Sequence, residues 1–357
     1  MGEHKLRIGI ITHNFGEDAG IFVKDFTKEL SKKTHTFVFH INSETKLGNL
    51  NPLNPLSILR VRDILESASI QAVRFVRDNK IDFIIAMWAL PAGLIAESIK
   101  KKLATPYCVW ALGSDINTYA KIPILKNMIK NALINADLRF ANSMSLSQKI
   151  KILTKMPCNF LPAATTFDPK IGHKPVNLKK NTFNFLFVGR LEKVKGTDIL
   201  IDAFNILRST YLNSHLTIIG TGSMEKSLKA RVKYLRLEKN VSFLGKKNHQ
   251  EVINYMFFSD CLIIPSRSES LPLVLLEAAF ANLPVIATDV GDCKRLIRKY
   301  KIGFVVSENS PVALAEIMEK ALTANLKLFK VGLKKLSAEF SLNKSANLIL
   351  NYIQSAK

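Results

Sequence analysis

The sequence lacks an apolar run long enough to cross a membrane. Its longest one, FIIAMWALPAGLIA, is shorter than a spanning helix of about 20 residues and is broken by Pro91 and Gly93. The opening sequence MGEHKLRIGIITHNF enters an apolar strand almost at once, which leaves no room for a signal peptide. We therefore expect a soluble cytoplasmic protein, free or bound at the inner face of the cell membrane.

Cysteine is also scarce, and the usual motif for a metal-bound diphosphate is missing. The four cysteines are scattered without the paired spacing of a metal site: Cys108, Cys158, Cys261 and Cys293. No Asp-x-Asp pair occurs anywhere in the chain. These absences predict reduced, buried thiols, no metal and no cofactor.

Acidic residues are few relative to basic ones, and the formal net charge is +22. Residues 1–165 carry 22 Lys and Arg against 13 Asp and Glu, and the remainder carries 29 against 16, so the excess is spread over both halves. No recognition helix or aromatic-interleaved basic patch appears, which argues against a nucleic-acid partner. Peripheral contact with an anionic membrane is a candidate interaction, because KIPILKNMIKNALIN (121–135) has an apolar helical face and several lysines. A surface helix packed on a core explains the same pattern equally well.

Short apolar strands alternate with amphipathic helical segments along the whole chain. Apolar residues make up 47% of the 357 positions, enough for two cores. Continuous apolar strands joined by helices predict parallel sheets covered on both faces. The predicted parts are an N-terminal domain (1–165), a linker (166–182), a second domain (183–335) and a closing helix (336–357).

The second half opens with a pattern typical of a phosphate site. In FNFLFVGRLEKVKGTDILIDAF (183–204) a strand ends at Gly189, Arg190 and Lys195 follow, and Gly196 precedes a helix. Two cations and a helix start can neutralise a diphosphate without a metal. Each cation taken alone would be an ordinary exposed loop residue. Gly220, at a later strand end, is weaker evidence for the same site.

Two glutamates stand in SRSESLPLVLLEAAFANLPVIATDVG (266–291). Pro272 is expected to start a helix with Ser270 as its cap, so that Glu269 lies in the loop and Glu277 in the helix. Residues eight apart on a helix are separated by about 12 Å, more than the about 5–9.5 Å of glycosidase carboxylate pairs. Two carboxylates beside a helix start favour instead a ligand that carries both phosphate and hydroxyls. Solvent-facing glutamates on an ordinary helix are the alternative.

These motifs together resemble the family-4 glycosyltransferases, which are also called group 1. These are retaining enzymes of GT-B fold, with two facing Rossmann-like domains and a C-terminal helix that crosses back to the first. The resemblance covers most of the chain and is strongest in its second half. It implies that Arg190 and Lys195 bind the donor diphosphate and act in catalysis with Glu269, which lies near the donor sugar, while Glu277 binds the ribose. The other donor-site residues implied are Gly189, Gly220, Gly245, Lys246, Leu271, Pro272 and Leu273.

In the first half, MWALPAGL and VWALGSDI occupy the positions of family motifs that line the acceptor side. Gly20 corresponds to the glycine of the first strand–helix loop, and Asp115 lies within the second of these motifs. The family frequently has a histidine where this chain has Leu112, and His13 is the candidate to take its place. A structural histidine is the alternative for His13.

The resemblance implies transfer of a hexose from a UDP- or GDP-linked sugar to a hydroxyl of a carbohydrate or lipid-linked saccharide. The anomeric configuration is retained and no metal is needed. Assembly of a bacterial surface polysaccharide, lipopolysaccharide or other glycolipid is the expected setting. Two other hypotheses stay open: a sugar-nucleotide epimerase of the same fold, and a non-catalytic protein that binds a nucleotide sugar.

Overall fold

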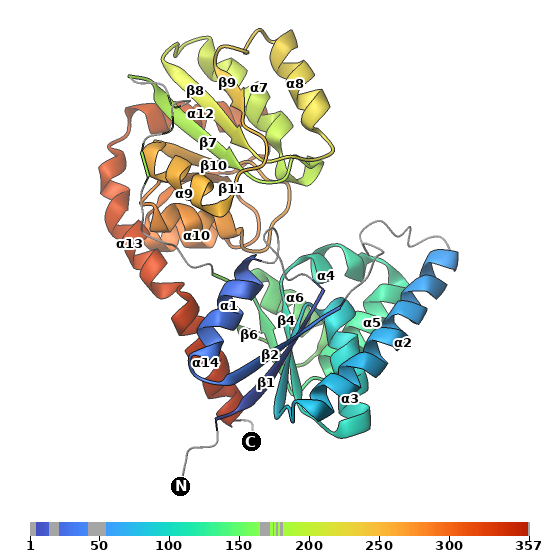
Figure 1. Cartoon of the computed structure of the whole chain (residues 1–357). Coiled ribbons are helices and arrows are strands. Elements are labelled where there is room, and N and C mark those ends of the chain that lie inside the picture. Colours follow the sequence, from blue (N-terminus) through green and yellow to red (C-terminus); the bar gives the residue numbers. More distant parts are fainter. Residues whose placement is uncertain are drawn as a thin grey trace. The chain divides into compact units, whose positions relative to one another are not determined.

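The computed structural model describes residues 5–13, 21–41, 55–164, 172, 173, 175, 178 and 181–355 (Figure 1). The chain divides into two compact units, which we describe separately. The first contains residues 1–166 and 341–357, and the second contains residues 167–340. Most of the predicted linker lies outside the described residues.

The first unit is built around a parallel sheet of six strands in the order β2-β1-β3-β4-β5-β6. Its strands are β1 (Arg7–Thr12), β2 (His35–His40), β3 (Phe83–Met87), β4 (Tyr107–Ala111), β5 (Leu138–Ala141) and β6 (Asn159–Phe160). Its helices are α1 (Ile21–Ser31), α2 (Pro55–Asp78), α3 (Leu94–Leu103), α4 (Ser114–Asn117), α5 (Pro123–Ile134), α6 (Met144–Thr154) and α14 (Leu342–Ser355). The strand order reverses between β1 and β3.

The second unit contains another six-stranded parallel sheet, in the order β12-β11-β10-β7-β8-β9. Its strands are β7 (Phe183–Val188), β8 (Ser214–Ile219), β9 (Val241–Phe243), β10 (Cys261–Ile264), β11 (Val285–Thr288) and β12 (Gly303–Val306). Its helices are α7 (Thr197–Arg208), α8 (Glu225–Tyr234), α9 (His249–Phe258), α10 (Leu273–Phe280), α11 (Cys293–Tyr300), α12 (Pro311–Thr323) and α13 (Lys330–Glu339). Here the order reverses between β7 and β10.

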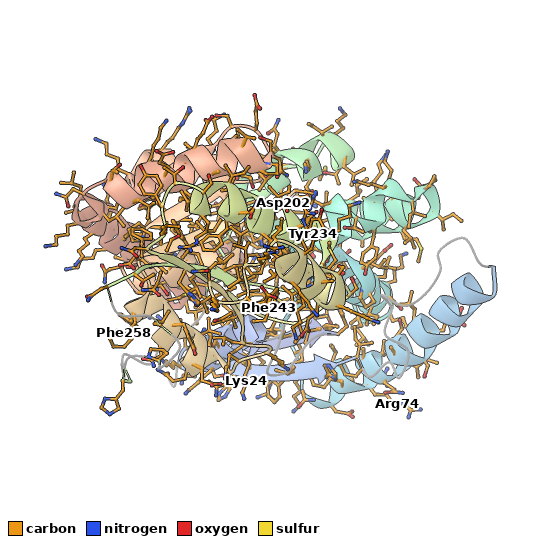
Figure 2. The ribbon with its side chains drawn as sticks, turned by 90° about the horizontal axis from the view of Figure 1, so that it is seen from above. Lys24, Arg74, Asp202, Tyr234, Phe243 and Phe258 are labelled. Carbon is orange, nitrogen blue, oxygen red and sulfur yellow. The ribbon has the colours of Figure 1, made fainter. Side chains whose placement is uncertain are left out.

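Apolar runs become the central strands of both sheets, as predicted. All residues of β3, β4, β10 and β11 are buried, because helices cover both faces of a parallel sheet. The short edge strand β6 was not predicted, since two half-buried residues give no periodic signal. On the surface, the helices are also linked by polar contacts. Arg231 on α8 donates to Asp202 on α7 at 2.8 Å, and its guanidinium lies over the Tyr234 ring. Asp202 and Tyr234 are labelled in Figure 2.

The closing helix α14 belongs to the first unit, as the GT-B resemblance implies. Ile349 and Ile353 on its inner face are fully buried. The Ser345 hydroxyl donates to the Pro162 carbonyl at 2.8 Å, and the Asn343 amide donates to Glu29 on α1 at 2.9 Å. These contacts attach the C-terminal segment to the N-terminal sheet.

All four cysteines are buried, free thiols. Burial raises the pKa of Cys158 to about 11 and that of the other three further, so all four stay protonated at neutral pH. Among the helices that the structure describes, we find none with the length and apolar composition needed to span a bilayer.

Candidate functional site

The candidate site of the second unit lies where its strand order reverses. In open parallel sheets, ligands bind outside the carboxyl ends of the strands at such a reversal. Here these are the ends of β7 and β10. The loop after β7 carries Gly189, Arg190 and Lys195, and the loop after β10 carries Glu269. Residues from two distant parts of the sequence thereby meet at one sheet edge.

Close backbone packing explains the glycine at position 220. A Cβ atom on Gly220 would lie 1.9 Å from the Gly189 carbonyl oxygen. The Gly220 N–H donates to the Gly245 carbonyl at 2.8 Å, so the ends of β7, β8 and β9 are joined through these three residues. Gly189 and Gly220 therefore shape the loops through their backbone. Their contact with a donor stays a prediction.

Lys195 and Glu269 form the centre of the candidate site. Lys195 Nζ lies 2.6 Å from Glu269 Oε1, and both side chains are largely shielded from solvent. The Ser266 hydroxyl donates to the same oxygen at 2.8 Å. A cation from the β7 loop is thus held against a carboxylate from the β10 loop, 74 residues away. The sequence predicts both residues but not their ion pair.

Arg267 links the loop after β10 to the segment after β7. Its guanidinium donates to both oxygens of Asp198 at 2.8 and 2.7 Å and to the Lys193 carbonyl at 2.6 Å. Its backbone N–H donates to the Val194 carbonyl at 2.8 Å. Burial alone would raise the pKa of Asp198, but the hydrogen bonds and charge of Arg267 hold it below the usual value. Arg267 is a positioning residue that our sequence analysis missed, because its partner is remote in sequence.

Arg190 is placed differently from Lys195. Its side chain is exposed, and among the described residues it has no hydrogen-bond or ion-pair partner. The neighbouring Glu192 instead accepts from the Ser223 N–H and hydroxyl, at 3.1 and 2.6 Å. The Arg190 guanidinium is therefore available to a ligand, whereas Glu192 is used to fix the loop after β8.

Helix α10 offers backbone donors at the same edge. It begins at Leu273 with Pro272 as the N-cap, and no side chain caps it. The prediction that Ser270 caps this helix is wrong. Pro272 is extended and directly precedes the first helical residue, so Pro272 is the N-cap. The backbone carbonyl of Ser270 accepts from the Asp292 N–H at 2.9 Å. The predicted phosphate contacts of Leu271, Pro272 and Leu273 thus coincide with an uncapped helix start.

Glu277 lies on α10 and is 8% exposed. Its Oε1 atom is 3.5 Å from Nε2 of His249, the first residue of α9. The solvent-facing alternative for Glu277 is therefore wrong, because its carboxylate is turned inward. His249 was missed in the sequence, where a single histidine after Asn248 gives no distinctive signal.

The loop before α9 contains two further predicted residues. Gly245 has a φ of +65°, a left-handed conformation that favours glycine, and an added Cβ atom would meet nothing within 4 Å. Lys246 is exposed. The structure leaves room beside Gly245, and its predicted proximity to a nucleotide base stays a prediction.

In the first unit, His13 follows β1 and packs edge-on against Trp88, which follows β3, with 4.7 Å between ring centres. Burial, with repulsion from His40, lowers the pKa of His13 to about 4, so the ring is neutral at neutral pH. Its Nδ1 atom is buried without a hydrogen-bond partner among the described residues. Trp88 has a φ of +71°, a strained conformation for a bulky residue. Gly20 lies outside the described residues.

Asp115 is fully buried and holds two loops of the first unit together. Its carboxylate accepts from the N–H groups of Ala89, Gly113 and Ile116 at 2.9, 3.1 and 3.1 Å. Burial raises its pKa, and the three donors oppose that shift. Asp115 thus acts on the loops after β3 and β4, and its predicted place on the acceptor side stays a prediction.

Substitution of Gly196 tests the loop packing. Gly196→Ala should reduce the unfolding free energy by about 3 kcal/mol or more, because its Cβ would lie 1.9 Å from the Pro265 carbonyl oxygen. Gly245→Ala is the matched control, with a similar positive φ but open space, and should cost only about 1–2 kcal/mol. Calorimetric unfolding of both variants measures the difference. Equal losses of unfolding free energy in the two variants would show that the backbone conformation, rather than the Pro265 carbonyl contact, is the reason that position 196 requires glycine.

Residues 168–335 match the family model "Glycosyl transferases group 1". An uncharacterized glycosyltransferase of Methanocaldococcus jannaschii is 30% identical over 68% of this chain and 65% of its own length. The putative teichuronic acid biosynthesis glycosyltransferase TuaC of Bacillus subtilis is 27% identical over 68% of this chain and 62% of its own length. The match therefore spans less than two thirds of either relative.

Among solved structures, Anabaena HepE in complex with UDP and glucose has a TM-score of 0.74, with 19% identity, over 98% of this chain and all of that one. Fold and site together define a two-unit GT-B protein. The match to the group 1 glycosyltransferase model lies within the second unit.

Proposed function

We propose that this protein is a retaining glycosyltransferase that moves a hexose from a nucleotide-diphosphate sugar to a hydroxyl group. The observation that carries the proposal is the ion pair of Lys195 with Glu269 beside the uncapped start of α10, at the strand reversal of the second unit. In the proposed complex, the phosphates, the sugar and the ribose would each meet a polar or charged group of this site. The match of residues 168–335 to the group 1 glycosyltransferase model supports the same activity.

Electrostatics support binding of the donor without a metal. A diphosphate ester carries about two negative charges, and Lys195, exposed Arg190 and the start of α10 (about +0.5) would together balance them. The Lys195 charge is matched by Glu269 in this structure. A bound diphosphate would attract Lys195 and release Glu269 oxygens toward the hydroxyls of the donor sugar. No group of three or more metal-ligating side chains is present in the part of the chain that the structure describes.

The proposed reaction conserves atoms and charge in one displacement. The bond between the sugar C1 and the diphosphate oxygen breaks, and a bond from the acceptor oxygen to C1 forms on the same face. The acceptor proton passes to the departing phosphate oxygen. Arg190, Lys195 and the α10 N–H groups would stabilise the charge that grows on the diphosphate. Exclusion of water would prevent hydrolysis of the donor.

The donor is proposed to be UDP- or GDP-linked. A solved neighbour of the same fold binds UDP and glucose, which favours UDP as the first donor to test. The name of the Bacillus subtilis relative favours a bacterial surface polysaccharide as the product class. A lipid-linked saccharide at the inner face of the membrane would then be the acceptor.

A thermal-shift panel of UDP, GDP, ADP and dTDP, each with its sugars, tests donor binding. The cognate nucleotide at about 100 times its Kd should stabilise the second unit by about 2.7 kcal/mol, and the others should not. The same panel with EDTA tests metal independence, and inorganic phosphate is the control for charge alone. No stabilisation by any nucleotide would overturn the proposal.

Incubation of the protein with labelled donor then distinguishes the three activities. Appearance of label in an acceptor shows transfer, a changed sugar on the nucleotide shows epimerisation, and intact bound donor shows a binding protein.

A further inference from the structure

The surface formed by α5 and α6 of the first unit is unusually basic. Its lysines are all exposed: Lys121, Lys126, Lys130, Lys149, Lys151 and Lys155. Helices α5 and α6 pack together, and Lys126, Lys130 and Lys149 line one groove between them, while the other three lysines lie on or next to the same helices. We refer to this region as the α5–α6 surface (Figure 1).

Nearby carboxylates do not neutralise this surface. Between residues 116 and 156 the sequence contains one acidic residue, Asp137, and Lys100 of α3 lies 2.7 Å from it. Lys149 donates to the Asn117 amide oxygen at 2.6 Å. Within the described residues, none of the six lysines forms an ion pair. Six positive charges therefore face solvent without a protein partner of opposite sign.

Apolar side chains are exposed among the lysines. Ile124 on α5 is 54% exposed and Ile152 on α6 is 62% exposed. A groove of about 580 Å³ lies between the helices, lined by Lys126, Lys130, Lys149 and Ile152 among others. Charge and apolar area thus occur together, which a solvated lysine face alone does not require.

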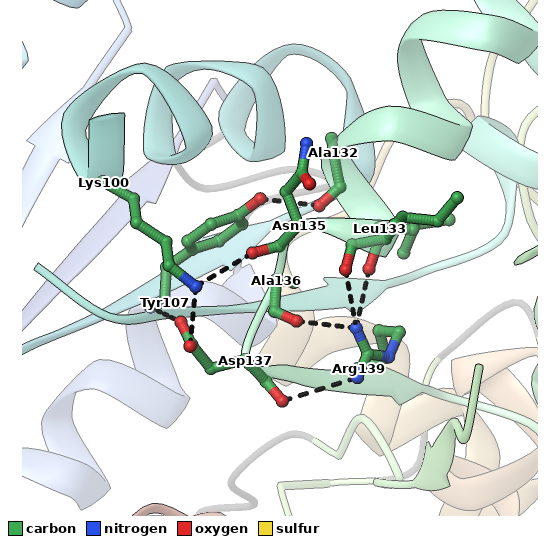
Figure 3. Close-up of polar contacts among 9 residues, drawn as sticks. Lys100, Tyr107, Ala132, Leu133, Asn135, Ala136, Asp137 and Arg139 are labelled. Atoms are coloured by element: carbon green, nitrogen blue, oxygen red, sulfur yellow. Dashed lines mark hydrogen bonds and ion pairs between the residues drawn. The ribbon is translucent and has the colours of Figure 1, made fainter. Parts of the chain in front are cut away.

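The sheet holds this surface in a fixed orientation. Arg139 on β5 donates to the carbonyls of Leu133 and Ala136 at the end of α5, at 2.9 and 2.6 Å (Figure 3). The Tyr107 hydroxyl donates to the Ala132 carbonyl at 2.8 Å (Figure 3). Helix α6 starts three residues after β5, with Ser143 as its N-cap. The lysines therefore lie on or next to helices that are packed against the sheet, not on an unstructured segment.

We infer that the α5–α6 surface docks on an anionic lipid bilayer. Lysines would pair with phosphate headgroups, and Ile124 and Ile152 would enter the headgroup boundary. The exposed apolar side chains are isoleucines rather than the aromatic rings on which nucleic-acid bases stack, so a bilayer is favoured over single-stranded nucleic acid. The inference does not depend on the transfer reaction, because it concerns only where the first unit binds.

Docking through the α5–α6 surface would also bring the loops at the carboxyl edge of this sheet close to the bilayer. Helices α5 and α6 both follow strands, β4 and β5, and their N-termini lie toward the carboxyl edge of the sheet, where ligands bind. His13 and Trp88 follow β1 and β3 at that same edge. A lipid-linked acceptor could reach this edge without leaving the bilayer.

Vesicle co-sedimentation tests the inference on the full chain. The protein should bind phosphatidylcholine vesicles that contain phosphatidylglycerol, and binding should fall steeply as salt is added. The variant Lys126→Gln/Lys130→Gln/Lys149→Gln should bind about a hundredfold more weakly. Ile124→Ser/Ile152→Ser should weaken binding at least about tenfold even at low salt.

The matched control changes the same amount of charge elsewhere in the first unit. Arg74→Gln/Arg77→Gln/Lys102→Gln alters exposed cations of α2 and α3, of which Arg74 is labelled in Figure 2, and should leave vesicle binding within about threefold. Equal losses of vesicle binding in the two triple variants would overturn the inference, because the total charge of the protein would then explain the binding. Tighter binding to a short RNA than to vesicles would overturn it as well. Nucleotide-induced thermal shifts, measured in parallel, confirm that the variants fold and report separately on the donor site.

Discussion

Replacing Lys195 with alanine is expected to reduce kcat/KM for sugar transfer by about a hundredfold to a thousandfold. Its ammonium group is held at the strand reversal of the second unit, where charge is proposed to grow on the leaving diphosphate. Loss of one preorganised charge-stabilising donor has an effect of about this size in other enzymes. The deficit should appear in kcat as well as KM, because the interaction strengthens as the sugar–phosphate bond breaks.

Lys193 provides the matched control for this experiment. It lies two residues earlier in the same turn and its side chain is exposed, while only its carbonyl takes part in the contact with Arg267. Lys193→Ala should therefore leave kcat/KM within about threefold. If both variants lose activity equally, the effect comes from general charge or loop folding, and the assignment of Lys195 is wrong.

Substitutions of the two glutamates should have separate effects, one on nucleotide binding and the other on turnover. Glu277→Ala should weaken nucleotide binding by about 1.5–3 kcal/mol, which corresponds to a roughly tenfold to hundredfold increase in Kd, because a buried acceptor for ribose hydroxyls is removed. Glu269→Gln should leave nucleotide Kd within about threefold and lower kcat about a hundredfold. The glutamine keeps an oxygen for Lys195 and Ser266 but loses the charge.

Calorimetry for Kd and steady-state kinetics for kcat measure this pair of effects. His249→Gln serves as a probe of the Glu277 environment, because it removes the ring that lies 3.5 Å from the carboxylate while both glutamates remain. Small and equal effects of Glu269→Gln and Glu277→Ala on both quantities would contradict their roles as contacts to opposite ends of a donor.

Part of the candidate site could be predicted from local sequence. Gly189, Arg190 and Lys195 follow an apolar run and precede a helix, so their place at a strand end depends on neighbours only a few residues away. The same is true of Glu269 and Glu277 around the start of α10. The capping prediction for Ser270 was wrong because the chain stays extended through Pro272, so that Pro272 is the N-cap residue.

Contacts between distant segments could not be predicted in this way. Arg267 with Asp198 and His249 with Glu277 join residues 69 and 28 positions apart. Nothing in the residues next to Arg267 or His249 indicates these partners. The buried position of Asp115 was likewise hidden, since a carboxylate with three backbone donors looks the same in sequence as an exposed one.

The sequence by itself determined the alternation of apolar strands with helices and the presence of two parallel sheets, because burial on both faces requires continuous apolar runs that are visible locally. The tertiary structure decided which loops meet. Pairing of β7 with β10 brings Lys195 to Glu269, and pairing of β1 with β3 brings His13 to Trp88. Strand order depends on how all the helices pack against the sheet at once. The chemistry of this protein therefore depends on an arrangement that no single segment of the sequence encodes.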